Sequence, residues 1–260
     1  MTLLVVTRVI KVDYRNKPLK PLLAVIVFDP ILYFTGETFG IAATTASESG
    51  IFIACIPAAC LIASSLLLQK RPTRFQVIGI LITFSGVLVT VLAASVASSF
   101  SVLGYAFLIL AVVSYALFSV SVEMSAAFSS TEITYAMLAT GAVFFTVLAL
   151  GEATATGNLT TVLTLTFMDR DFFIAILYLG IGCSILAFFM SNVAIVKIGV
   201  NRMSTFAGIS TVMAIMSGAL VLHERLNLGQ IVGAIIIVIG VLIANVGASR
   251  YKERQETEAG

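Results

Sequence analysis

The chain has 260 residues, of which 59% are hydrophobic and 11% are charged, and its formal net charge is +2. An ordinary soluble domain carries about 25% charged residues, so this composition excludes a soluble globular protein. The basic residues are confined to loops and termini, which leaves no basic face for binding nucleic acid. Apolar runs of about 20 residues, the length that a helix needs to cross a bilayer, recur along nearly the whole sequence. They predict an all-α membrane protein.

The apolar runs predict eight transmembrane helices after an N-terminal segment, 1–20, that contains five basic residues. In chain order the predicted spans are 21–43, 51–68, 75–97, 102–123, 133–152, 171–196, 203–222 and 228–246. A longer polar loop, 153–170, separates the fifth span from the sixth. A charged tail, 249–260, closes the chain.

The loop charges predict how the chain is oriented in the membrane. Eight spans place both termini on one side, and cytoplasmic segments usually carry an excess of Lys and Arg. If the termini are cytoplasmic, 13 of the 15 Lys and Arg lie inside, and only Arg170 and Arg225 lie outside. We therefore expect a multi-pass protein of the plasma (inner) membrane with both termini in the cytoplasm.

One hairpin of the sequence occurs twice. Residues 69–90 align with 223–244 at an offset of 154 residues, and seven of the 22 positions are identical. The identical pairs are Arg71/Arg225, Gln76/Gln230, Gly79/Gly233, Ile82/Ile236, Gly86/Gly240, Val87/Val241 and Leu88/Leu242. The turn of the first copy is predicted to lie inside and that of the second outside. The two copies are therefore expected to be inverted, which requires an odd number of spans in each.

This inversion predicts the domain organisation. Residues 99–248 form a complete repeat of five helices, whereas residues 1–98 hold only three, and 249–260 form the cytoplasmic tail. By the same offset, the first repeat lacks its first two helices. We expect the chain to be a fragment, the product of a mis-set start site, or a naturally shortened family member.

Two stretches, 44–89 and 200–243, resemble the two EamA domains of the drug/metabolite transporter superfamily. The resemblance rests on small residues entering the second span, on Pro57 within that span, and on a polar turn followed by Gln-x-x-Gly and Gly-Val-Leu. The triplet Ser114-Tyr115-Ala116 stands where the family usually has an aromatic-Ala pair. This resemblance implies a ten-helix fold of two inverted five-helix repeats, cytoplasmic ends and transport of small metabolites.

The sequence departs from the family pattern at two paired positions. The acidic residue expected at the hairpin turn is present as Glu224, but its counterpart in the first copy is Lys70. The proline of the first copy, Pro57, is paired with Thr211.

The first predicted span contains two acidic residues, Asp29 and Glu37. A charged side chain near the middle of a bilayer costs about 2.5–3.5 kcal/mol on insertion scales and usually faces a cavity or a partner. At about 100° per residue, Asp29 and Tyr33 share one helix face with two glycines, and Glu37 lies about 80° away. We expect Asp29, Tyr33 and Glu37 to line the substrate path, where a carboxylate binds a proton or a cationic group. The alternatives are an acid satisfied by a neighbouring helix and, for Asp29, a side chain that stabilises a kink at Pro30.

The sixth span carries a polar strip of Ser184, Ser191 and Asn192. Under the same offset Glu37 aligns with Ser191, so the two copies place polar side chains at a similar depth. Because transporters usually bind substrate near the midplane between repeats, Ser191 and Asn192 are candidate substrate ligands. Interhelical hydrogen bonding is the alternative. Tyr115 of the fourth span could offer its ring and hydroxyl to a substrate, or could be structural.

The leading hypothesis for function is a secondary transporter that exports small organic metabolites, such as amino acids or related compounds, by alternating access. No motif of an ATP-binding domain or of a soluble enzyme occurs, so we expect no enzymatic activity and no cofactor or metal. The expected partners are a small-molecule substrate and the lipid bilayer, with the chain acting either alone or as a homodimer. The alternative is a non-transporting truncated membrane protein, or a half-transporter that needs a partner chain.

Overall fold

The computed structural model describes residues 12–15, 17–44, 46–53, 55–69, 72–95, 101–159, 164, 169–201, 203 and 228–259. Within these ranges every regular element is a helix and no strand occurs. The all-α prediction is confirmed for this part of the chain. Apart from Met203, the predicted span at 203–222 and the polar turn after it lie outside the described residues.

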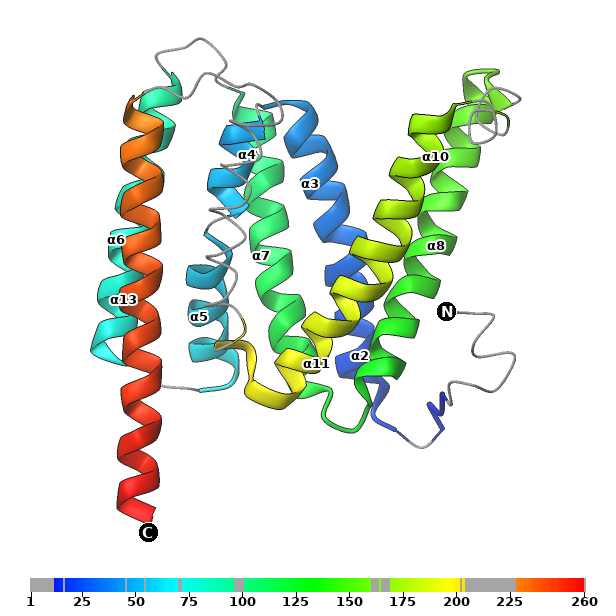
Figure 1. Cartoon of the computed structure of the whole chain (residues 1–260). Coiled ribbons are helices and arrows are strands. Elements are labelled where there is room, and N and C mark those ends of the chain that lie inside the picture. The colour runs from blue at the N-terminus through cyan, green and yellow to red at the C-terminus, as the bar shows by residue number, and fades with distance from the viewer. Residues whose placement is uncertain are drawn as a thin grey trace.

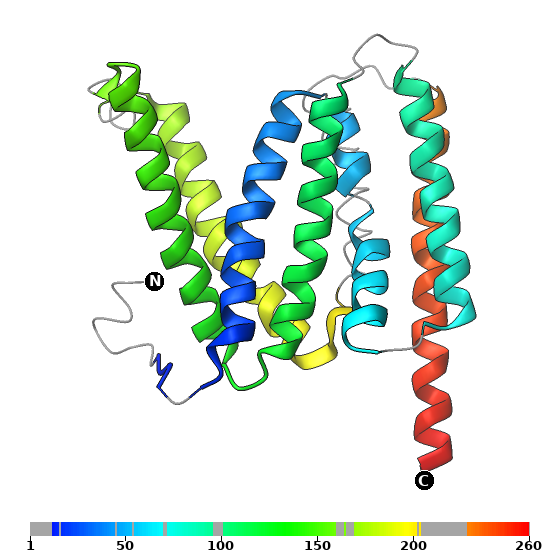
Figure 2. The ribbon, with the colours of Figure 1, turned by 180° about the vertical axis from the view of Figure 1, so that it is seen from behind.

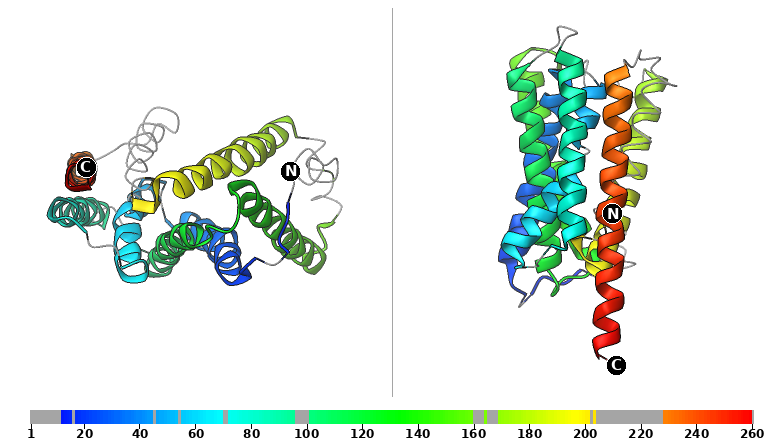
Figure 3. Two further views of the ribbon diagram at one scale, coloured as in Figure 1. Left: turned by 90° about the horizontal axis from the view of Figure 1, so that it is seen from below. Right: turned by 90° about the vertical axis from the view of Figure 1, so that its left-hand side faces the viewer.

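The helices form an elongated bundle (Figures 1 and 2). They are α2 (Leu19–Ile26), η1 (Val27–Leu32), α3 (Tyr33–Ala42), α4 (Ala46–Ile53), α5 (Ile56–Leu67), α6 (Arg74–Ser95), α7 (Val102–Met124), α8 (Ser130–Ala155), α10 (Arg170–Leu177), η2 (Tyr178–Ala187), α11 (Phe188–Ile198) and α13 (Leu228–Ala259). The two η elements are π-helical stretches that join their neighbours into longer helices. Viewed along the bundle, α6, α5, α7, α3 and α8 form a curved row, the α10–α11 helix crosses one side of this row, and α13 lies against α6 (Figure 3).

Four helical segments among the described residues are long and apolar enough to cross a membrane. They are Leu19–Ala42, Val102–Met124, Ser130–Ala155 and Arg170–Ile198. Three shorter apolar segments are Ile56–Leu67, Arg74–Val89 and Ile231–Ala244. These segments coincide with predicted spans, while the total of eight spans and the two five-helix repeats stay predictions.

The first span is broken near its middle at Asp29 and Pro30. The backbone of Asp29 is extended, with φ −141° and ψ 123°. The ring of a proline pushes the preceding residue out of the helical conformation, and Pro30 has no N–H for the helical ladder. The kink predicted at Pro30 is therefore confirmed. The break leaves the Asp29 side chain fully buried inside the bundle.

The second predicted span, 51–68, is not one continuous helix. The structure divides it into α4 and α5, and Pro57 lies in the first turn of α5. Proline is tolerated at the start of a helix, where the missing N–H has no helical partner, whereas inside a helix it clashes with the carbonyl four residues earlier. The prediction of a single helix at 51–68 is wrong for this reason.

Two helices extend beyond their predicted bounds. α8 begins at Ser130 because Ser129 and Glu132 form a reciprocal capping box at its N-terminus. α13 continues to Ala259 through the charged tail that was predicted as a separate segment. The tail is rich in Glu and Arg and also contains Lys, Gln and Ala. All five residue types have high helix propensity, so the helix can continue through the tail.

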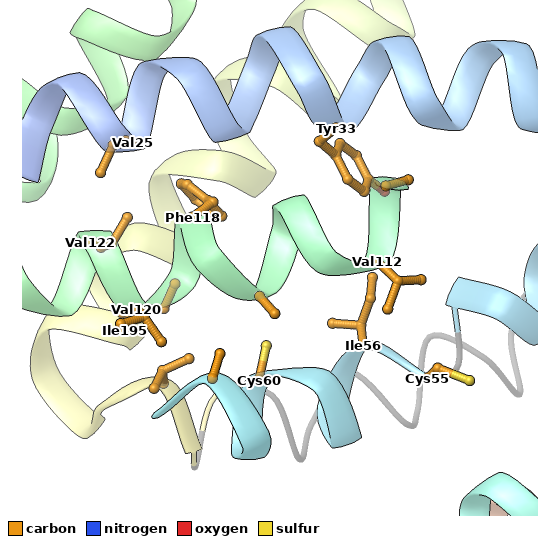
Figure 4. Close-up of a cluster of buried hydrophobic side chains, with 14 of the residues drawn as sticks. Val25, Tyr33, Cys55, Ile56, Cys60, Val112, Phe118, Val120, Val122 and Ile195 are labelled. Carbon is orange, nitrogen blue, oxygen red and sulfur yellow. The ribbon is translucent and has the colours of Figure 1, made fainter. Parts of the chain in front are cut away.

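The core of the bundle is built around α7. Val25 and Tyr33 approach α7 from the first span, Ile56 and Cys60 approach it from α5, and Ile195 approaches it from α11 (Figure 4). α7 itself contributes the completely buried side chains Phe118, Val120 and Val122. The helix face that carries Asp29 and Tyr33 is buried. The core thus fixes the first span in register with α7.

α6 and α13 lie side by side and run antiparallel (Figure 1). A Cβ at Gly79 would lie 2.5 Å from the carbonyl oxygen of Gly240, and a Cβ at Gly86 would lie 2.8 Å from that of Gly233. Backbones this close leave no room for a side chain, as in other membrane helix pairs that meet through small residues. In the sequence alignment Gly79 is equivalent to Gly233, and Gly86 to Gly240. Across the interface Gly79 instead meets Gly240, and Gly86 meets Gly233.

The described basic residues gather at one end of the bundle. The starts of α2 and α6 and the ends of α11 and α13 lie at this end (Figure 1). Every described Lys and Arg belongs to a segment at this end except Arg170, which begins α10 at the other end. The positive-inside rule expects this distribution when the basic end is cytoplasmic.

Candidate functional site

Two large cavities lie between the described helices. One, of 670 Å³, lies between α4–α5, α6 and α7, and its lining is almost entirely apolar. The other, of 430 Å³, lies between the first span, α8 and the η2–α11 helix. It is lined by Asp29, Pro30, Phe34, Thr38, Met137, Leu138, Gly141, Ala142, Phe145, Ser184 and Phe188. Small-molecule sites have volumes of about 300–1,000 Å³ and a few polar groups in an apolar lining, so the second cavity is the candidate site.

Among the described residues that line this cavity, Asp29 is the only ionisable one. Its side chain is fully buried, and neither carboxylate oxygen has a hydrogen-bond partner among the described residues. Its neighbour Pro30 packs closely against Gly141 of α8, since a Cβ built on Gly141 would lie 2.8 Å from the proline ring. A buried carboxylate without a counter-charge is strongly unfavourable. Asp29 is therefore expected to carry a proton or to lie beside a bound cation.

Glu37 forms a cluster with two tyrosines beside Asp29. The Tyr33 hydroxyl donates a hydrogen bond of 2.7 Å to Glu37 Oε1. The ring of Tyr33 packs against that of Tyr115, with 5.5 Å between centroids and 59° between planes. Asp29 and Glu37 are close enough to interact electrostatically. The structure thus brings together the predicted residues of the first and fourth spans, but the half-buried Glu37 and the two tyrosines are not among the residues that line the cavity.

Ser191 and Asn192 occupy different surroundings on α11. Ser191 lies beside the Tyr115 hydroxyl without the geometry of a hydrogen bond, so it adjoins the tyrosine–glutamate cluster. Asn192 is fully buried and donates from Nδ2 to Thr134 Oγ1 at 3.0 Å and to Met137 Sδ at 3.4 Å. Both acceptors belong to α8. The geometry therefore matches the interhelical alternative for Asn192, and a contact between Asn192 and substrate stays a prediction.

Replacing Asn192 with leucine is expected to lower stability by only about 0.6 kcal/mol, the average for interhelical hydrogen bonds in membranes. Thr134 keeps a hydrogen bond of 2.7 Å to the Ser130 carbonyl in this variant, so no new unpaired hydroxyl arises. Thr134→Val should lower stability by a similar amount, and the double variant should lose no more stability than the two single variants together. Thermal unfolding of the purified protein would measure these losses. Loss of transport in Asn192→Leu but not in Thr134→Val would instead indicate a direct contact between Asn192 and substrate.

The structure also contains an ion-pair cluster that the sequence analysis missed. Glu132 Oε2 lies 2.7 Å from Lys17 Nζ. The Glu132 carboxylate also accepts hydrogen bonds from the backbone N–H groups of Asp13, at 2.9 Å, and Ser129, at 2.8 Å. The Tyr14 hydroxyl donates to the Glu132 carbonyl at 2.9 Å. The signal in the sequence was the Ser-x-x-Glu spacing of a capping box.

This cluster fixes the segment before α2 to the start of α8. Burial, followed by electrostatic interaction with Glu132 and Tyr135, raises the pKa of Tyr14 to about 12. The Tyr14 hydroxyl therefore stays protonated at neutral pH and remains a hydrogen-bond donor. The cluster holds together two of the elements that border the cavity, at the basic end of the bundle.

The helices and the cavity between them define a helical membrane protein with an internal ligand-sized site, an arrangement typical of membrane transport proteins. A family model described as "EamA-like transporter family" matches residues 1–92 and 102–246. The chain belongs to this EamA-like transporter family, which is part of the drug/metabolite transporter superfamily. It is therefore a multi-pass membrane transporter of this type, and the resemblance noted in the sequence is confirmed.

Two proteins that are similar in sequence to this chain are also described as transporters. "Uncharacterized transporter YcxC" of Bacillus subtilis (strain 168) is 31% identical over 247 residues, which cover 94% of this chain and 79% of that protein. "Uncharacterized transporter YetK" of the same organism is 25% identical over 210 residues, covering 79% of this chain and 61% of that protein. A solved structure described as "Crystal structure of protein" superposes with a TM-score of 0.63 at 19% identity, covering 91% of this chain and 79% of that one. This last likeness shows the fold alone.

Proposed function

We propose that the protein is a secondary transporter that exports small organic metabolites, such as amino acids or related compounds, across the plasma membrane by alternating access. The main observation that supports this proposal is the environment of Asp29. This residue is a fully buried acid without a hydrogen-bond partner among the described residues, and it lies at a break in a membrane-spanning helix beside a 430 Å³ cavity. Broken helices and ionisable groups at membrane depth mark substrate sites in transporters.

The packing of α6 against α13 supports the inverted repeat that alternating access requires. These helices are the equivalent members of the two predicted repeats, 1–98 and 99–248, and they run antiparallel. Equivalent helices of an inverted repeat point in opposite directions across the membrane. Rocking of one repeat against the other would expose the cavity alternately to the two sides, with both termini in the cytoplasm.

Glu37 is proposed to couple transport to protons. Its carboxylate is half-buried, is hydrogen-bonded to Tyr33, and interacts with the buried Asp29. A neighbouring carboxylate that gains or loses a proton changes the field at Asp29. Protonation of Glu37 would therefore change how strongly the cavity holds a substrate.

The test is flux of labelled amino acids and amines into proteoliposomes that contain the purified protein. If one proton is exchanged per substrate, a gradient of one pH unit sustains a concentration ratio of about tenfold. In Glu37→Gln the ratio is expected to fall to about unity. Glu152→Gln, which neutralises an exposed carboxylate at the far end of α8, should behave as the wild type.

Two results would count against this proposal. A Glu37→Gln variant with unchanged flux and pH dependence would remove the coupling role. Absence of flux for every labelled compound, in a preparation that is folded, would favour a non-transporting protein or one that needs a partner chain.

A further inference from the structure

We infer that the 430 Å³ cavity binds an organic cation with an aromatic or apolar body, an amine rather than a zwitterionic amino acid. This inference rests on the proposed function, because it names the substrate class of the same site. It follows from three features of the lining: its charge, its aromatic rings and its hydrogen-bonding groups.

The only charge that the described lining can carry is negative. Among the described residues that line the cavity, Asp29 is the only ionisable one, and none is Lys or Arg. A second acid, Glu37, interacts electrostatically with Asp29. A ligand with one positive charge in this cavity supplies the counter-charge that the buried, unpartnered Asp29 carboxylate lacks.

The aromatic rings of the lining suit the same ligand. Phe34 packs edge to face against Phe145, with 6.4 Å between centroids, and against Phe188, with 5.9 Å. All three rings line the cavity together with Asp29. The face of an aromatic ring attracts a cation within about 6 Å of its centroid, and the same rings give an apolar body a surface to pack on.

The described lining contains no cationic group that could pair with a substrate carboxylate. Two hydroxyls, of Ser184 and Thr38, occur among its described residues. The Ser184 hydroxyl donates its proton to the Leu179 carbonyl at 2.8 Å, so its oxygen is left as an acceptor. The carboxylate of an amino acid would therefore lie near Asp29 without a cationic partner among the described residues. Because an unpaired buried charge is strongly unfavourable, an amine should be preferred.

The test is equilibrium binding of radiolabelled 2-phenylethylamine to the full chain in lipid nanodiscs at pH 7, where the amine is protonated. 2-Phenylethanol and phenylalanine serve as competitors, because they share its ring but are neutral and zwitterionic. Removing one partner of a buried charge pair weakens binding about 30-fold or more, so the unlabelled amine should compete about 30-fold better than the alcohol. Phenylalanine should compete no better than the alcohol.

Two variants and one control variant test which side chains produce the preference for the amine. In Asp29→Asn the amine should lose its advantage and bind no more tightly than the alcohol. In Phe145→Leu the preference for the amine over the alcohol should fall about threefold, from the lost cation–ring attraction. Glu152→Gln removes an exposed carboxylate far from the cavity and should leave the ranking unchanged. If Asp29→Asn does not fold, the order in which the three compounds compete for the wild type, together with the Phe145→Leu result, still tests the inference.

The outcomes separate this inference from the proposed function. If the amine fails to bind, or if phenylalanine or the alcohol competes as well as the amine, the cation inference is overturned. Flux of zwitterionic amino acids that depends on Asp29 would then leave the transporter proposal standing. Conversely, Asp29-dependent amine binding without flux in proteoliposomes would support the ligand class and overturn transport.

Discussion

Replacing Gly240 with leucine is expected to lower the melting temperature of the protein by about 10 °C. A Cβ at this position would lie 2.6 Å from the backbone nitrogen of Thr83 and 2.7 Å from the Gly79 carbonyl oxygen. Overpacking costs about 1–3 kcal/mol, and a clash with backbone atoms belongs at the upper end because no side chain can rotate away. α6 and α13 share the most extensive contact among the described helices, so their separation would loosen a large interface.

The cysteines of the chain offer a way to measure this effect. Cys55 and Cys60 are buried, whereas Cys183 is half-buried. In a Cys183→Ser background, a thiol-reactive fluorogenic dye would report unfolding through the two buried thiols. Gly180→Leu is the matched control, since a Cβ at Gly180 would meet nothing within 4 Å. Equal melting temperatures for the two leucine variants would contradict the close approach of α6 and α13.

Replacing Glu132 with alanine is expected to destabilise the protein by about 3 kcal/mol. The change leaves the backbone N–H groups of Asp13 and Ser129 without their acceptor. It also removes the partner of the Lys17 ammonium, which lies 5.2 Å from the centroid of the Phe128 ring. Lys17 is partly exposed to solvent, so its share of the loss is the smaller one. Glu132→Gln should cost about half as much, because glutamine can keep the capping hydrogen bond but not the ion pair.

Hydrogen–deuterium exchange of the peptide that contains residues 12–17, together with the melting temperature, would measure the Glu132 effect. Exchange in this peptide should rise in Glu132→Ala, because the segment is held to α8 through that side chain. Glu152→Ala changes an exposed acid at the opposite end of the same helix and should leave both readouts unchanged. Unaltered exchange in Glu132→Ala would show that other contacts hold the segment.

Local sequence features were enough to predict most of the helical segments. Span length and hydropathy set the bounds of α6 and α7 within one or two residues for the described part of the chain. Pro30 predicted the break in the first span, since its effect on Asp29 acts between adjacent residues. The same local rule, applied to Pro57, would have predicted the division between α4 and α5. The family was also visible in short motifs of the two hairpins.

The sequence by itself determined that this chain is a helical membrane protein, that its first span carries two acids, and that Asp29 and Tyr33 share a face. These properties depend on hydropathy, helical period and neighbouring residues. Only the tertiary structure decided that Phe34, Phe145 and Phe188 line one cavity together with Asp29 and that Asn192 bonds to α8. The partners in these contacts come from different helices, and the side chains that face one another are set by how those helices pack, which no local pattern encodes.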